Sequence, residues 1–198
     1  MPLPPRTYDT SLNSELERLQ YQIEVIRQEA EGLLWGLSDE QFNWSPGGGA
    51  WSMAQCMDHL NVTNARMIEQ MEASIEGGRQ AGLRSDGPFV YSLLGRWFRK
   101  IVEPPPKFKA KAPQVFKPAP RRSMEETQAA WKKTHDRLEE LILAANGLDL
   151  AKIKVRSAAL PMLKFELGMA FWIQTAHDRR HLWQMRQIRN HPGFPAGC

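Results

Sequence analysis

Two histidines stand four residues apart near the end of the chain, in the stretch "TAHDRRHLWQ" that covers residues 175–184. On a helix, residues four apart lie about one turn from each other, so His177 and His181 present their imidazoles to the same side. Two ring nitrogens leave most of an ion's coordination shell empty. A metal site therefore needs a third ligand, and His59 is the candidate because it falls on the apolar face of an earlier predicted helix.

Three imidazoles on facing helices would form a three-nitrogen set with positions open for water or substrate. An open position is typical of a catalytic site rather than a closed structural one. Neutral imidazole suits zinc, nickel, iron or copper better than magnesium. We therefore predict one divalent ion, zinc or nickel, on His59, His177 and His181.

Four neighbours are candidates for supporting roles. Gln184 follows His181 by about one turn, and Gln174 precedes His177; either amide is placed to hold a ligand or a water by a hydrogen bond. Arg180 is a candidate anchor for an anionic substrate, the alternative being a salt bridge to a glutamate of the first or third long helix. Cys56 is interpreted as a small buried hydrophobe, the alternative being a fourth ligand or a redox-active thiol.

The remaining polar residues near these positions fit simpler interpretations. Asp178 invites comparison with the acidic residue of the zincin motif H-E-x-x-H, but the third zincin ligand is missing downstream. We interpret Asp178 as a surface group or a support behind the ligands. His135 is expected at a polar edge of the third long helix, and His191 in a solvated terminal loop.

Hydrophobic periodicity predicts an all-α four-helix bundle that forms a single domain over residues 1–198. Ser38, Ser52 and Ser123 each precede a Gln or Glu by three residues, which is the spacing of a capping box. The segment 103–120 contains six prolines and is either a linker or an ordered flap anchored by Phe108, Val115 and Phe116. The long helices are expected at 11–37, from Ser52 to Gly77–Gly78, at 123–145 and at 163–190, with a short extra helix at 88–102.

Composition argues against several functional classes. The net charge is only +4 and basic residues alternate with acidic ones along most of the chain, so nucleic acid is not the default partner. The basic segment 107–122 leaves nucleic-acid binding as an alternative. Two cysteines make no disulfide framework, no apolar run reaches the length of a membrane span, and the N-terminus has no signal-peptide pattern. These features predict a cytoplasmic protein.

The motifs "PGGGAWSMAQCMDHL" and "HDRRHLWQMRQIRNHPGFP" resemble those of the DinB-like superfamily, which includes bacillithiol and mycothiol S-transferases and maleylpyruvate isomerase. The family pattern is a Gly-Trp-Ser/Thr entry into the second helix, a following His, and H-x3-H on the last helix. Trp51, Ser52, His59, His177 and His181 match it. Better-studied bacillithiol-type members carry extra histidines beside the pair, where this chain has Arg180 and Leu182, so the identity of the thiol is not carried over.

The resemblance implies an up-up-down-down-like bundle, a divalent metal and frequently a homodimer. It also implies thiol transfer or hydrolysis of a small-molecule substrate, with a low-molecular-weight thiol as a possible co-substrate. The alternative is a metal-binding stress protein or sensor without catalysis.

Overall fold

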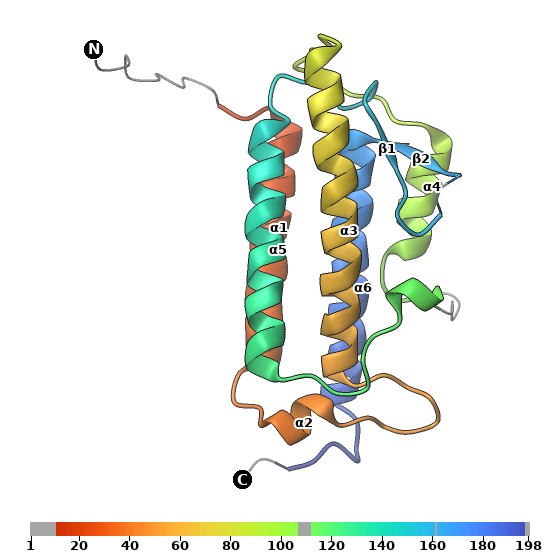
Figure 1. The fold of residues 1–198 in the computed structure, drawn as a ribbon. Helices are drawn as coiled ribbons and strands as arrows, with labels where there is room; N and C mark the ends of the chain where they lie inside the picture. The colour runs from red at the N-terminus through yellow and green to blue at the C-terminus, as the bar shows by residue number, and fades with distance from the viewer. Residues whose placement is uncertain (1–10, 107–111, 161, 197–198) are drawn as a thin grey trace, which may run out of the picture.

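The computed structural model describes residues 11–106, 112–160 and 162–196 and contains four long helices that lie side by side (Figure 1). A two-stranded antiparallel sheet pairs Val155 with Phe165 and precedes the last helix. The elements in chain order are α1 (Ser14–Leu34), α2 (Asp39–Asn43), α3 (Met53–Gln80), α4 (Leu93–Val102), a 3-10 turn η1 (Gln114–Phe116), α5 (Met124–Ala144), β1 (Lys154–Arg156), β2 (Lys164–Glu166) and α6 (Leu167–Arg189). The predicted all-α four-helix bundle with a short extra helix is confirmed.

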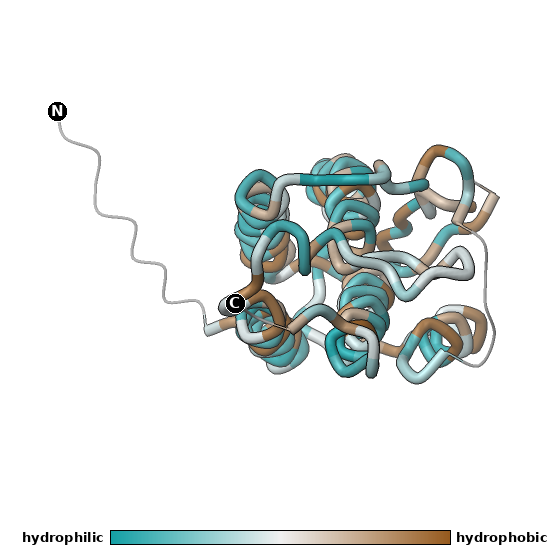
Figure 2. Tube along the Cα trace, turned by 90° about the horizontal axis from the view of Figure 1, so that it is seen from below, coloured by the Kyte–Doolittle hydropathy of each residue, from teal (hydrophilic) through white to brown (hydrophobic). Residues whose placement is uncertain are grey.

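Seen end-on, α1, α5, α3 and α6 form a four-cornered bundle and α4 lies outside it beside α6 (Figure 2). The guanidinium of Arg79 near the end of α3 donates to the carbonyl of Ala144 at the end of α5, so these two helices run in the same direction. α1 and α6 run the opposite way (Figure 1). The order of directions is therefore down-up-up-down, not the expected up-up-down-down, because the long connection 81–123 returns the chain to the end where α3 began.

Side-chain caps begin α2, α3 and α5 where the sequence predicts them. Ser38 and Ser52 each form a complete capping box, with Gln41 and Gln55 respectively as the reciprocal partner. Ser123 accepts a hydrogen bond from the backbone N–H of Glu126. The cap at Ser52 fixes where α3 begins, which places His59 about two turns into the helix.

Several predicted boundaries are wrong. α1 spans Ser14–Leu34 and not 11–37. α3 continues past Gly77 and Gly78 and ends before Gly82, whose φ of 65° is the left-handed conformation that terminates helices. α4 begins at Leu93 rather than at Pro88, because the side chain of Ser92 caps it by accepting from the N–H of Gly95. Residues 164–166 form β2 instead of the first turn of the last helix.

Apolar side chains form two separate core clusters, one toward each end of the bundle. On α6 the first cluster extends to Phe171 and the second begins at Leu182. On α3 the two clusters are separated between Leu60 and Ile68. The middle of the bundle is therefore a buried polar layer, and the candidate site lies in it.

Candidate metal centre

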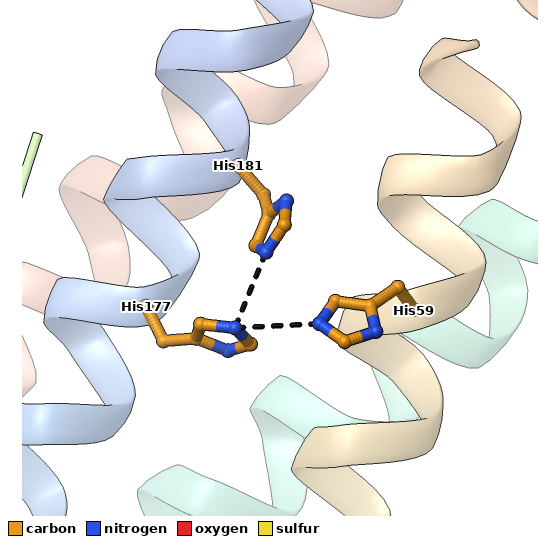
Figure 3. Close-up of side chains that lie close together, drawn as sticks. All are labelled: His59, His177 and His181. Carbon is orange, nitrogen blue, oxygen red and sulfur yellow. Dashed lines mark hydrogen bonds between the residues drawn. The ribbon is translucent and has the colours of Figure 1, made fainter. Parts of the chain in front are cut away.

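The three histidines predicted to share an ion converge in this polar layer. His59 comes from α3, and His177 and His181 come from successive turns of α6 (Figure 3). Their candidate ligand atoms all lie within 4.8 Å of one another. Side chains 118 positions apart in the sequence thus meet between two facing helices.

The spacing of the nitrogens fits a shared ion. Nε2 of His177 lies 3.4 Å from Nε2 of His59 and 3.2 Å from Nε2 of His181. Two nitrogens each about 2.0–2.1 Å from one zinc ion, at angles of roughly 90–110°, are separated by about 2.9–3.4 Å. Two of the three nitrogen pairs therefore have the separation that one zinc ion requires, and the third pair lies within 4.8 Å.

The tautomer of His59 is fixed by the segment that follows α4. Nδ1 of His59 lies 2.7 Å from the carbonyl oxygen of Phe116, and since that oxygen only accepts, Nδ1 carries the proton. Nε2 is then the atom with the free lone pair, and it is the atom directed at the other two histidines (Figure 3). A backbone carbonyl behind a histidine is a common way to orient a metal ligand.

Phe116 is held in place by its own side chain and by Asp58. The Phe116 ring is only 2% exposed. The carboxylate of Asp58, the residue before His59, accepts from the N–H of Ala119 at 2.8 Å and from Nε of Arg122 at 2.8 Å. The ordered-flap interpretation is thus confirmed for 112–120, although Val115 is exposed and Phe108 lies outside the described residues.

Trp51 forms a wall of the site. Its ring stacks on His181 at an interplanar angle of 17°, with 5.8 Å between centroids, and lies 5.0 Å from the ring of His59. The residue immediately before the Ser52 cap is therefore in contact with two of the three imidazoles. This apolar wall leaves less room for water around the cluster.

Burial keeps the imidazoles neutral, which is the form that binds metals. Burial is the main cause that lowers the pKa of His177 to about 4, and the neighbouring His59 lowers it further. Burial likewise lowers the pKa of His181 well below its usual value, and that of His59 less strongly because the Phe116 carbonyl favours its charged form. All three rings are ready to donate a lone pair at neutral pH.

Arg180 and Gln184 both lie beside the histidine ligands. Arg180 is half-buried, its own pKa is lowered by desolvation, and its charge lowers the pKa of both His177 and His181. Its guanidinium donates to the carbonyl of Ile101 at 3.3 Å. Gln184 interacts with His181 and favours its protonated form, although Nδ1 of His181 has no partner with regular hydrogen-bond geometry.

Gln174 does not support the ligands, contrary to prediction. Its amide donates to the side-chain oxygen of Asn64 and, at 3.5 Å, to Asp178. Asp178 also accepts from Asn64 at 3.2 Å, and its second oxygen faces Nε2 of His135 at 3.4 Å. Asp178 and His135 are both fully buried, so the expectations of a surface aspartate and a polar helix edge are wrong.

Cys56 and His191 match the simpler interpretations. Cys56 is fully buried, burial raises the pKa of its thiol, and it lies outside the histidine cluster. His191 is exposed beside Trp44 in the C-terminal segment. Within the described ranges the cluster consists of three histidines with no carboxylate or thiol.

Sequence reasoning missed Trp51 and the carbonyl of Phe116 as parts of the site. Trp51 carried a signal, its place directly before a helix cap, but that place alone does not tell which side chains it meets. The Phe116 carbonyl gave no signal in the sequence, because every residue has a backbone carbonyl. No helix in the described part of the chain combines the length and apolar character needed to cross a bilayer.

Comparison with solved structures finds one of similar fold. The chain resembles a protein described as "YfiT from Bacillus subtilis is a probable metal-dependent hydrolase with an unusual four-helix bundle topology". The TM-score is 0.60 and the identity 13%, and the match covers 98% of this chain and 95% of that one. At this identity the likeness shows the fold alone. Comparison with curated proteins finds no match.

A family model describes most of the chain. The model of the DinB superfamily matches residues 22–185, which include all three histidines and all four long helices except the first turns of α1 and the last turn of α6. The matched region is more than half of the chain. The protein belongs to the DinB superfamily.

Proposed function

We propose that the protein is an enzyme that depends on one divalent metal ion, zinc or nickel, and that hydrolysis of a small-molecule substrate is its reaction class. The observation that carries the proposal is the convergence of three neutral imidazoles with no fourth protein donor in the described cluster. Such a set leaves coordination positions for small molecules. The similarity to a protein described as a probable metal-dependent hydrolase supports the choice of reaction class.

Each side chain has a distinct part in this proposal. An ion held in this way supplies a Lewis acid that makes water more acidic and polarises carbonyl or phosphoryl oxygens. The Phe116 carbonyl holds His59 in the tautomer that faces the cluster. Trp51 excludes water from one side. Arg180 places a positive charge beside His177 and His181, which favours substrates with a carboxylate or phosphate.

Asp178 has no direct part in the reaction. One of its oxygens accepts from Asn64 and Gln174, and the other faces Nε2 of His135 in the bundle interior. A zincin-like mechanism requires the acidic residue of the motif to act as a general base next to the ion. The proposal therefore assigns proton transfer to solvent or substrate and not to this carboxylate.

A metal-binding protein without catalysis is the second candidate. It is favoured by the burial of two of the three ligands, since His59 is 6% and His181 7% exposed while His177 is partly exposed. Two cavities elsewhere on the described surface are lined by other residues and by none of the three histidines. Such a protein would bind the ion tightly without catalysing a reaction.

Hydrolysis and thiol-transfer assays on metal-loaded protein separate these functions. Stripped protein is loaded with zinc or nickel and offered carboxylic and phosphate esters, and separately an electrophile with a low-molecular-weight thiol. We expect ester turnover in proportion to bound metal, reduced to background in His181→Ala and unchanged in His191→Ala. Turnover only with the thiol would replace hydrolysis by thiol transfer. Full metal occupancy without turnover would overturn the enzyme and favour the second candidate.

A further inference from the structure

A cavity of about 510 Å³ lies on the outer side of α6, between the beginning of α1 and α4. In the end-on view α6 lies between α1 and α4, on the opposite side from the α3–α5 pair (Figure 2). Trp172 of α6 lines this cavity and precedes His177 by five residues, which turns its side chain by roughly 140° around the helix axis. The cavity and the histidine cluster therefore use different faces of α6.

Arginines dominate the polar lining of the cavity. Arg18 comes from α1, and Arg96 and Arg99 come from positions three apart on α4. Arg99 lies over the ring of Trp172 at 4.5 Å, which orients its guanidinium. The side chain of Arg96 makes no hydrogen bond or ion pair with the residues that the structure describes, and Arg18 uses only its Nε, on the carbonyl of Ser14.

One buried carboxylate lies among these arginines and does not neutralise them. Glu15 is 9% exposed, and one of its oxygens accepts from the hydroxyl of Tyr91 and from Nε1 of Trp172, each at 2.7 Å. Over the described chain no ion pair joins Glu15 to Arg18, Arg96 or Arg99. Its role is to fix the Tyr91 and Trp172 rings. Arg99 also pairs through Nε with Glu103 at 3.4 Å and keeps its two terminal nitrogens for a ligand, whereas Arg18 and Arg96 have no carboxylate partner among the described residues.

Two glycines allow the elements around the cavity to pack more closely than any larger residue would permit. A Cβ on Gly168 would lie 1.9 Å from the hydroxyl of Tyr91, and a Cβ on Gly95 would lie 2.7 Å from Cγ of Met169. These glycines let Tyr91 and α4 approach α6 closely. Phe89 and Val90 complete the apolar lining. The cavity thus has a preformed wall of rings under a group of cations.

We propose that this cavity is a second ligand site, distinct from the metal centre, for a small organic anion whose carboxylate or phosphate contacts Arg18, Arg96 and Arg99 while an aromatic or other apolar body packs on Tyr91, Phe89 and Trp172. The planar guanidinium group matches the two oxygens of such anions. The volume falls in the usual range of small-molecule sites, which combine apolar walls with a few polar groups.

Calorimetric titration with phenyl phosphate and benzoate tests the site, with benzylamine as the same body carrying a cation. The same titrations are done with metal-free His177→Ala protein. An anion that binds at the histidine cluster and not in the cavity would lose its affinity in this variant. We expect millimolar or tighter binding of at least one anion in both proteins. Arg96→Ala should weaken it roughly tenfold or more, since a charge-assisted hydrogen bond is lost. Lys100→Ala is the matched control on α4, because Lys100 does not line the cavity.

Several results would overturn the proposal. They are the absence of binding by both anions, binding that Arg96→Ala and Arg18→Ala leave unchanged, and binding of benzylamine in preference to the anions. Folding of each variant is checked by its thermal unfolding, and Arg18→Ala provides a second variant on another helix. Loss of metal binding at the histidines would leave this proposal untouched, because the two sites share no residue.

Discussion

The pKa of His177 sets the sign of a pH effect on stability. In the unfolded chain this imidazole takes up a proton near pH 6.5, whereas burial in the native protein lowers its pKa to about 4. Between these values the unfolded state binds more protons than the native state, so the free energy of unfolding falls as the pH falls. The contribution is fully present above pH 6.5 and is lost progressively toward pH 4.

We therefore expect metal-free protein to lose stability between pH 6.5 and 4 more steeply than His177→Gln, which cannot take up this proton. Each unit by which the native pKa is lowered corresponds to about 1.4 kcal/mol. Urea unfolding with a chelator present, at several pH values across this window, measures both slopes. Equal slopes for the two proteins would contradict the neutral, buried state assigned to this ring.

For individual residues, the sequence predicts the metal ligands better than the residues that surround and orient them. His177 and His181 follow from helical spacing, and His59 from its place on an apolar face. Gln174 occupies an equally suggestive position, but its partners Asn64 and Asp178 depend on how α3 packs against α6. Spacing along one helix determines which residues share a face and not which residues of the next helix they meet.

Adjacent glycines in α3 allow a sharp test of helix packing. A Cβ on Gly77 would meet nothing within 4 Å, whereas a Cβ on Gly78 would lie 2.3 Å from Cδ1 of Ile153. Because alanine is favoured over glycine inside a helix, Gly77→Ala should raise the free energy of unfolding by about 0.5–1 kcal/mol. Gly78→Ala should lower it by about 1–3 kcal/mol, because the added methyl overpacks this contact.

Urea denaturation of the two variants measures this difference. Two alanines of equal effect would contradict the close packing of Gly78 against Ile153. Sequence reasoning misplaced the end of α3 because a Gly-Gly pair is typical of a helix end, while the close contact with Ile153 that uses Gly78 is visible only in the fold.

The segment 112–120 gives a second prediction at the scale of elements. Phe116→Ala should free this segment from the bundle and loosen the carbonyl that holds His59, and zinc affinity should fall about 10–100-fold, as for other groups that orient a metal ligand. Val115→Ala is the matched control, since Val115 is 59% exposed. Competition with a zinc chelator measures the affinities, and a Phe116→Ala protein that binds as tightly as the control would exclude this role.

Helical periodicity predicts the four long helices well, because each buries one apolar stripe. It does not predict the short hairpin β1–β2, whose strands of three residues are too brief to show alternation. The ordered course of 112–120 was foreseen only as an alternative. Its partners, Asp58 and His59, are more than fifty residues away in the sequence.

At the scale of the whole molecule, the core is divided into two apolar clusters and a polar layer between them. Two apolar clusters hold the ends of the bundle, and the polar layer between them contains both the histidine cluster and the buried group of Asn64, Gln174, Asp178 and His135. Such a layer is unfavourable for folding unless its groups have partners. Three imidazoles that face one another with lone pairs are satisfied by a shared cation. The homodimer and the cytoplasmic location stay predictions.

Zinc titration of stripped protein, in competition with a chromophoric chelator, tests this account most directly. We expect one ion per chain, an affinity that falls roughly a hundredfold or more in His59→Ala, and no change in His191→Ala, whose histidine is exposed and outside the cluster. If His59→Ala binds zinc as tightly as the wild type, the three histidines do not share an ion.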